Sequence, residues 1–414
     1  MHLSIQRIAA LLLVAGPVSL AFAQPLTFGR ALDLAQQQSP GLAAGAASVR
    51  AAQHETRAAG RLPDPKLTVG VDNYPVSGPM RATLEGDFMT MQKLGVMQEV
   101  PNAAKRQARI EAAAASVGVA GSLQQIARWR VRVNAAQAWL ARYYLERKLE
   151  AFGELSRDSE TLLDVLRAQA ASGRSEAVET IEQRQELSRL EDRRDEMARD
   201  VARATAALRA LVGPDAESPI AGEAPDMPIA PDTLRTRLDR HPELLAYVAQ
   251  QAAAEADLHA AKAEKRPDWS VELAYAKRGP QFGNMVSLQF SVALPFFGAT
   301  RQDPMIASKT EQRSRIEDER EALRRDRAGE LDADLAERQA LSRQLQRARQ
   351  QALPLAEQRV ALLTAAFAAG RASLAGVLAA RRDLCDLRLR SIDLQGQLAA
   401  VTARLYFTYE ASPQ

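Results

Sequence analysis

The sequence predicts a mainly α-helical chain with a β membrane segment, built as two structural repeats of a helix, a β-hairpin and two long helices. Three observations support this fold class. Ala, Leu, Arg, Glu and Gln dominate the 414 residues, and these residues favour long helices. Four short segments alternate apolar and polar residues, as half-buried strands do. The same order of features occurs twice along the chain, which indicates a duplicated structural half.

Residues 1–23 have the pattern of a secretory signal peptide. Arg7 supplies the positive start, residues 8–20 are apolar, and residues 21–23 form a small-x-small cleavage site. A membrane-anchoring helix is the alternative, but the apolar stretch is short and Pro17 interrupts it. Gln24 rather than Cys follows the predicted cut, so we expect a cleaved chain without a lipidated N-terminus.

The internal repeat sets the expected domain organisation. Pro40 corresponds to Pro242 and Pro65 to Pro267, with matching apolar residues around each pair. We expect the first repeat over 24–212 and the second over 232–414. The segment 213–231, rich in Pro and Gly, is expected to join them.

Each repeat is predicted to begin with a helix, over 28–62 and 232–266. Pro40 and Pro242 fall inside these stretches and indicate either a kink or a fresh helical start.

A β-hairpin is predicted next in each repeat, at about 66–100 and 268–295. In these segments apolar residues occupy every second position, which gives each strand one apolar and one polar face. A membrane-spanning helix over 279–300 is the alternative, but Pro280 and Pro295 bracket that segment and the alternation is cleaner than any helical stripe. The expected lipid-facing residues are Leu67, Val69, Val71, Leu94, Val96, Trp269, Val271, Leu273, Leu288, Phe290, Val292 and Leu294.

Long helices are predicted to complete each repeat, at about 102–212 and 302–410. Apolar residues recur at heptad-like spacing, which is typical of coiled-coil packing. Residues 102–172 contain no proline, and a helix of about 70 residues would be about 100 Å long. Gly173 and Gly370 are expected at the turns between paired long helices, where a left-handed residue is needed.

Four amphipathic strands cannot close a barrel in lipid, because spanning barrels need at least about eight strands. Three copies would supply twelve strands and twelve helical columns. The sequence therefore predicts a trimeric 12-stranded β-barrel continuous with an α-helical barrel.

Charge and motif content argue against several functions. The 54 basic and 51 acidic residues are interspersed, so nucleic acid is not an expected partner. Cys385 is the single cysteine, and no phosphate loop, nucleophile elbow or HExxH motif occurs. We therefore expect no enzyme activity, cofactor or structural metal site.

With these features in place, the sequence resembles the TolC family of outer-membrane efflux proteins over about residues 26–409. No single shared motif is specific to the family. The order of the motifs, repeated in two halves after a signal peptide, is specific. The segments that carry the resemblance are Leu26-Thr27, Ala31-Leu32, Ser39-Pro40-x-Leu42, Gln98-Glu99-Val100-Pro101 with Lys105-Arg106, Ser172-Gly173-Arg174-Ser175 and Ala369-Gly370-Arg371-Ala372-Ser373.

The resemblance implies a homotrimeric exit duct in the outer membrane, embedded in its lipid and reaching into the periplasm. Such a duct meets a periplasmic membrane-fusion adaptor and an inner-membrane pump, here expected to be of the RND type. By resemblance, the hairpin tips contact the adaptor; the residues involved would be Gly173, Arg174, Ser175, Gly370, Arg371 and Ser373.

Within the family, the sequence looks most like the CzcC-type heavy-metal efflux branch. The short length, the missing lipid-attachment cysteine and the segment Leu62-Pro63-Asp64-Pro65 carry this likeness. Met89, Met91 and Met97 share parity with polar strand residues, and thioethers suit Cu(I) or Ag(I). Alternatively these methionines are lipid-facing or gap-filling apolar residues. Multidrug efflux, type I secretion and a periplasmic coiled-coil scaffold are the alternative functions.

Overall fold

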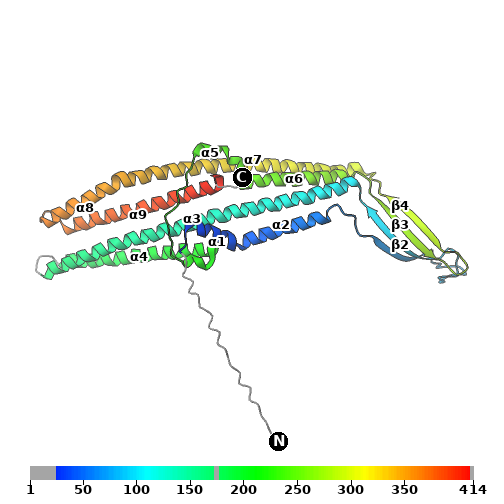
Figure 1. Cartoon of the computed structure of the whole chain (residues 1–414), viewed down its shortest axis with the longest axis horizontal. Coiled ribbons are helices and arrows are strands. Elements are labelled where there is room, and N and C mark those ends of the chain that lie inside the picture. Colours follow the sequence, from blue (N-terminus) through cyan, green and yellow to red (C-terminus); the bar gives the residue numbers. More distant parts are fainter. Residues whose placement is uncertain (1–24, 172–176, 411–414) are drawn as a thin grey trace, which may run out of the picture.

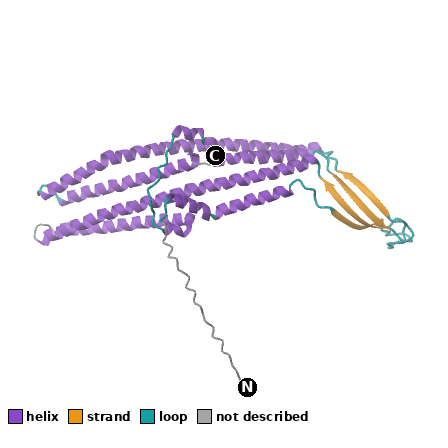
Figure 2. Cartoon of the chain, viewed as in Figure 1, coloured by secondary structure: helices purple, strands orange, loops and turns teal. Residues whose placement is uncertain are grey.

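The computed structural model describes residues 25–171 and 177–410. It shows a long, mostly helical body with a small sheet at one end (Figure 2). The predicted order of a helical segment, a hairpin and two long helical segments occurs twice, so the fold class is confirmed. The first repeat contains α1 (Phe28–Gln38), α2 (Pro40–Ala58), β1 (Lys66–Asp72), β2 (Met91–Val100), α3 (Ala103–Ala171) and α4 (Ala177–Val212). The second contains α5 (Pro231–Thr236), α6 (Pro242–Ala263), β3 (Trp269–Lys277), β4 (Met285–Val292), α7 (Gly298–Arg347), α8 (Leu353–Ala368) and α9 (Leu374–Leu405).

The helices lie side by side in one elongated layer (Figure 1). Helix α3 spans 69 residues and runs through most of the body, as its proline-free sequence predicts. Nearer the sheet, the lateral order is α2, α3, α6, α7; toward the other end it is α4, α3, α9, α8. Helix α3 is therefore the element that both ends of the body share.

Two prolines begin new helices rather than kinking old ones. Pro40 and Pro242 are the first residues of α2 and α6, where the missing amide hydrogen costs nothing. Ser39 caps α2 with its hydroxyl, and His241 caps α6 through its ring nitrogen. The continuous helices expected over 28–62 and 232–266 are therefore each divided, and they end early, at Ala58 and Ala263.

The second long segment also departs from the expectation of unbroken helices over 302–410. It begins earlier, at Gly298, and a π-helical turn at Ala348–Ala352 separates α7 from α8. Pro354 lies in the first turn of α8 and has no amide hydrogen to donate one turn back, toward this π-turn. A π-turn is one way in which a helix accommodates such a lost bond.

The core lies midway along the body, where α1, the 213–230 segment and α5 wrap the long helices. Trp139 of α3 is fully buried, and its indole NH donates a hydrogen bond of 3.0 Å to the carbonyl of Leu26. Arg142, one turn further on, is buried too and donates to the carbonyl oxygens of Ala216 and Ser218. The Trp139 bond holds the residues before α1 against α3, and the Arg142 bonds hold the segment between the repeats against it.

Candidate functional site

The sheet is antiparallel and its strands follow the order β1-β2-β3-β4. Within the described residues, β1 and β4 each pair with one strand only, so each leaves one edge open. Residues that pair directly share a face of a sheet. The register pairs Leu67 with Val96, Val96 with Leu273, and Leu273 with Leu288, which makes one apolar row across all four strands.

The register gathers the expected lipid-facing strand residues on one face. Leu67 and Val69 of β1 are 69% and 72% exposed, and Phe290 of β4 is 66% exposed. An apolar face this open to solvent needs an apolar partner. Val271 is half-buried. Leu294 was expected within the strand, but β4 ends at Val292, two residues earlier; its side chain is nevertheless exposed. The remaining exposed members are Val71, Leu94, Val96, Trp269, Leu273, Leu288 and Val292.

The opposite face of the sheet is polar. Lys93 Nζ lies 2.9 Å from Glu272 Oε1 across the β2–β3 pair, and Lys66 pairs with Glu99 across β1–β2. The register places Met91 and Met97 on this polar face, opposite Asp72 and Lys66. Met89 precedes β2 and lies in the connecting loop. The structure thus places two of the three methionines among the polar side chains of the sheet.

Gly370 forms the turn at the far end of the body. Its φ is +67°, a left-handed conformation that glycine adopts without strain. The amides of Gly370 and Arg371 donate to the carbonyls of Phe367 and Ala366, which closes the end of α8 in a Schellman motif. Ser373 then caps α9, and both it and Arg371 are exposed. The corresponding Gly173, Arg174 and Ser175 lie outside the described residues.

Charged side chains near this end pair between neighbouring helices. Asp383 of α9 contacts Arg359 of α8, and Asp386 contacts Arg193 of α4. These pairs are solvent-exposed, so each adds little to stability. They nevertheless join α9 to α8 on one side and to α4 on the other, and Cys385 of α9 packs with Phe152 of α3 and Met197 of α4. Burial raises the pKa of the Cys385 thiol.

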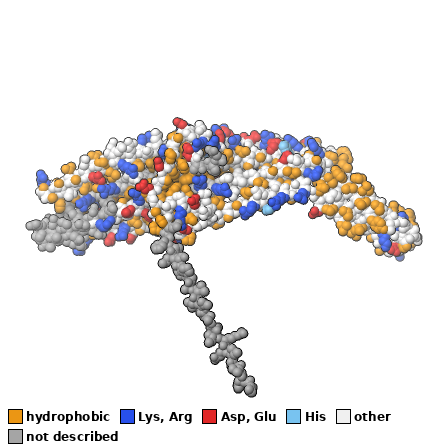
Figure 3. Space-filling model, viewed as in Figure 1, with side chains coloured by type: hydrophobic (Ala, Val, Ile, Leu, Met, Phe, Trp, Pro, Cys, Tyr) orange, Lys and Arg blue, Asp and Glu red, His pale blue; other side chains and the backbone are white. Residues whose placement is uncertain are grey.

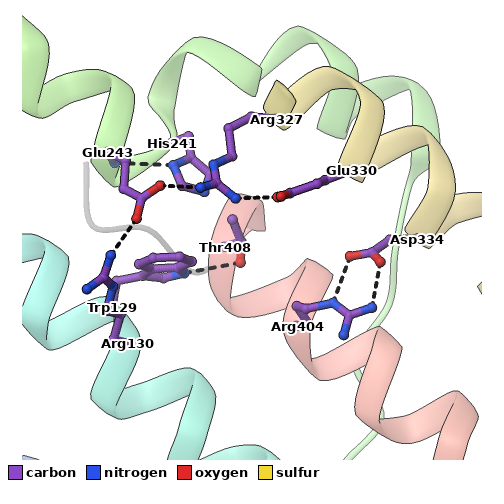
Figure 4. A network of polar contacts seen from close by, with 9 residues as sticks. All are labelled: Trp129, Arg130, His241, Glu243, Arg327, Glu330, Asp334, Arg404 and Thr408. Atoms are coloured by element: carbon purple, nitrogen blue, oxygen red, sulfur yellow. Dashed lines mark hydrogen bonds and ion pairs between the residues drawn. The ribbon is translucent and has the colours of Figure 1, made fainter. Parts of the chain in front are cut away.

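A polar network at mid-body escaped the sequence analysis (Figure 4). Glu243 of α6 accepts a hydrogen bond from Arg130 of α3 at 2.8 Å and forms an ion pair with Arg327 of α7 at 2.8 Å. His241 is 2% exposed beside this pair of contacts, and its burial lowers the pKa of its imidazole to about 4. Trp129 donates to Thr408 at 3.1 Å. These partners lie far apart in sequence, so no local spacing could have revealed the network.

None of the helices in the described parts of the chain is both long and apolar enough to cross a bilayer. Within 25–171 and 177–410, no cluster of three or more His, Cys, Asp or Glu side chains is arranged to hold a metal ion.

The model of the family described as "Outer membrane efflux protein" matches residues 31–214 and 233–408, which together make up most of the chain. The chain belongs to the outer membrane efflux protein family. Membership implies an outer-membrane location, and this family comprises channels rather than enzymes. The broad TolC-type resemblance of the sequence is thereby confirmed. The two matched segments also reflect the two repeats of this outer membrane efflux protein.

Solved structures show the same fold. A membrane protein from Pseudomonas aeruginosa superposes with a TM-score of 0.79 at 20% identity, covering 92% of each chain. CusC, described in terms of transmembrane channel formation, gives 0.75 at 18% identity and covers 92% of this chain and 91% of its own. VceC from Vibrio cholerae gives 0.74 at 20% identity, covering 92% and 95%. No curated protein is significantly similar to the chain in sequence.

Proposed function

We propose that this outer membrane efflux protein is the exit duct of a tripartite efflux system and conducts its cargo passively across the outer membrane. The observation that carries this proposal is the sheet. It combines one exposed apolar face, one polar face with ion pairs, and two open edges. Lipid on the first face and a water-filled lumen on the second would suit both surfaces.

The open edges support assembly as a homotrimer. An unpaired strand edge in hydrocarbon leaves several backbone groups without partners, at a cost of several kcal/mol for each. Pairing β4 of one copy with β1 of the next would remove both edges, and three copies would form a closed barrel of twelve strands. Edge helices α2 and α7 would meet in the same way, forming the α-helical barrel.

The N-terminal sequence supports export. We propose that residues 1–23 are a signal peptide that is cleaved and that the mature chain begins at Gln24 without lipidation. The body would then extend from the outer membrane into the periplasm.

The hairpin tips are the proposed contacts for a periplasmic adaptor, and through it for an RND-type inner-membrane pump. Arg371 and Ser373 are exposed at the α8–α9 turn, where a partner could reach them. By the internal repeat, Gly173, Arg174 and Ser175 would form the matching turn of the first hairpin.

Heavy-metal cations are the proposed cargo, with multidrug efflux and type I secretion as alternatives. The support is the CzcC-like sequence and the thioethers of Met91 and Met97 among the polar side chains of the sheet. A deletion strain should become sensitive to zinc, cadmium, cobalt, copper or silver and regain resistance with the wild-type gene. Sensitivity only to dyes and detergents would refute the metal cargo but leave the duct intact.

The duct itself is tested by biochemistry on the whole mature chain. We expect it to require detergent for extraction, to have the mass of three copies in mild detergent, and to conduct ions in planar bilayers. A folded monomer released by carbonate washing would instead support a periplasmic coiled-coil scaffold.

A further inference from the structure

Basic side chains gather at the end of the helical body next to the sheet, and we call them the basic belt. In Figure 3, apolar side chains cover the sheet, and Lys and Arg side chains gather over the adjoining helix ends on the same face. We define the belt by residues that have no carboxylate partner within the described parts of the chain. They are Arg57, Arg61, Arg106, Arg109, Lys262, Arg266 and Arg301.

Three of these cations lie at helix N-termini, where a positive charge is electrostatically unfavourable. Arg106 and Arg109 lie in the first two turns of α3, and Arg301 lies in the first turn of α7. Neither helix has an acidic residue of its own in its first turn. The Asp268 carboxylate does lie at the start of α3, but it accepts from the Asn102 amide and pairs with Lys105 rather than with these arginines. The helix dipole makes an N-terminus positive, so cations there reduce helix stability. Intrinsic helix stability therefore does not explain Arg106, Arg109 and Arg301, and an external anion would offset their repulsion. Lys262, by contrast, lies in the last turn of α6, where the helix dipole favours a cation.

A groove within the belt has the size and lining for such an anion. It has a volume of about 230 Å³ and lies between the first turns of α3 and the end of α6. Lys262 and Arg266 line it, together with the side chains of Gln107, Glu111 and His259. Glu111 is the acidic group in this lining, and it already accepts hydrogen bonds from Gln107 at 3.1 Å and from His259 at 2.9 Å. Glu111 is therefore engaged elsewhere, and Lys262 and Arg266 can bind an anionic ligand.

The position of the groove indicates which anion would reach it. Arg266 is three residues before Trp269, the first residue of β3, and Trp269 lies on the apolar face with its ring partly exposed. Tryptophan is enriched where hydrocarbon meets headgroups. If the apolar face contacts acyl chains, the groove lies at the depth of the adjacent headgroups. An aqueous anion would find the same cations, but only a lipid would also contact the apolar face.

We propose that Lys262 and Arg266 bind the phosphate headgroup of an anionic phospholipid in the periplasmic leaflet, with the rest of the belt adding longer-range attraction. The proposal rests on the outer-membrane duct proposed above. It assigns the belt a role in fixing the depth of the protein in the membrane.

The test uses the mature full-length chain in mild detergent. Phosphatidylglycerol or phosphatidylcholine is titrated in, and the shift in thermal midpoint is followed. We expect phosphatidylglycerol to stabilise the wild type more than phosphatidylcholine does. A basic residue near an anionic surface is worth about fivefold in binding. The double variant Lys262→Gln/Arg266→Gln should therefore need about 25-fold more phosphatidylglycerol for the same shift.

A matched control removes the same charge elsewhere. Arg343 and Arg347 are exposed on α7, far from the sheet, and the variant Arg343→Gln/Arg347→Gln should respond like the wild type. Equal stabilisation by both lipids, or an undiminished response in the groove variant, would overturn the proposal. Inorganic phosphate reproducing the full effect would overturn the lipid assignment in favour of a free-anion site. A protein that is trimeric and conducting yet indifferent to headgroup charge would refute this inference alone, whereas a monomer would refute the duct.

Discussion

Leu288 and Ser287 are neighbours on β4 whose side chains point to opposite faces of the sheet, so replacing each by arginine tests which face meets lipid. Leu288 pairs with Leu273 and is the β4 member of the apolar row, whereas Ser287 pairs with Ala274 on the polar face. Both residues are exposed in the single chain. Steric clash therefore does not distinguish Leu288→Arg from Ser287→Arg.

The expected magnitude depends on the medium. Leu288 is 61% exposed, so in water an arginine at this position would displace little buried apolar area and change stability by less than about 0.5 kcal/mol. In a bilayer, an arginine on the lipid face near the midplane costs about 2–4 kcal/mol. Leu288 occupies the fourth of eight positions in β4, which places it near the middle of the strand. We expect Leu288→Arg to cost this amount per copy, and Ser287→Arg to cost much less.

Guanidinium unfolding of vesicle-embedded protein measures this difference, and the amount of folded protein in the outer membrane provides a cellular readout. Leu288→Arg should shift the unfolding transition to lower denaturant, while Ser287→Arg should stay close to the wild type. Equal and small effects of both substitutions would show that the apolar face does not contact hydrocarbon. That result would refute the lipid-facing assignment and would favour the alternative function, a periplasmic coiled-coil scaffold.

Three further substitutions probe the body and its far turn. Arg142→Met should lower the free energy of unfolding by about 2–4 kcal/mol, because it leaves two buried carbonyls of the joining segment without their charged donor; denaturant titration measures this. Because the pKa of His241 is lowered to about 4 from 6.5, the folded state binds fewer protons than the unfolded state. The stability from its neutral form is therefore complete above pH 6.5 and is lost as the pH falls toward 4, with about 2 kcal/mol gone at pH 5. His241→Gln should flatten that part of the pH profile, and an unchanged profile would contradict the assignment. Gly370→Ala should cost about 1 kcal/mol because of the φ of +67°, whereas the control Gly153→Ala inside α3 should stabilise slightly.

The sequence was sufficient to predict the strands and their faces, because a two-residue alternation is a local property. Val69 and Leu94 belong to different strands. In each strand, the alternation of apolar and polar neighbours is enough to predict which face the residue occupies. Antiparallel pairing then places both on one face, as the register shows. The long α3 was predictable for a similar reason, because 69 residues without proline contain nothing that would end it.

Helix interruptions were predictable only where the residue before the proline also supplied a cap. Pro40 and Pro242 follow residues whose side chains cap the new helix, so both prolines begin a helix. Pro354 lacks such a cap, and a π-turn at Ala348–Ala352 precedes it where the regular helical hydrogen bond is lost. No local pattern in the sequence distinguishes a π-turn from a kink or a break at this proline.

The mid-body polar network could not be predicted from the sequence, because its partners lie on different helices. Glu243 has Arg130 and Arg327 as partners only because α6 lies between α3 and α7. In an Arg- and Glu-rich chain, any glutamate has many arginines that could pair with it, and spacing along one helix does not select among those on other helices. The network could be found only from the lateral order of the helices.

That lateral order also explains why one mode of assembly would serve both halves of the proposed duct. Each strand continues the helix next to it in sequence: β1 follows α2, β2 leads into α3, β3 follows α6 and β4 leads into α7. The order of the four strands therefore matches the order of the four helices beside them. The two open edges of a copy are different surfaces, so joining them head to tail gives a heterologous contact that closes only as a ring. The rotation that pairs β4 of one copy with β1 of the neighbouring copy would also bring α7 against α2 of that neighbour. One symmetry operation would therefore join both the sheets and the helical bodies into a continuous wall.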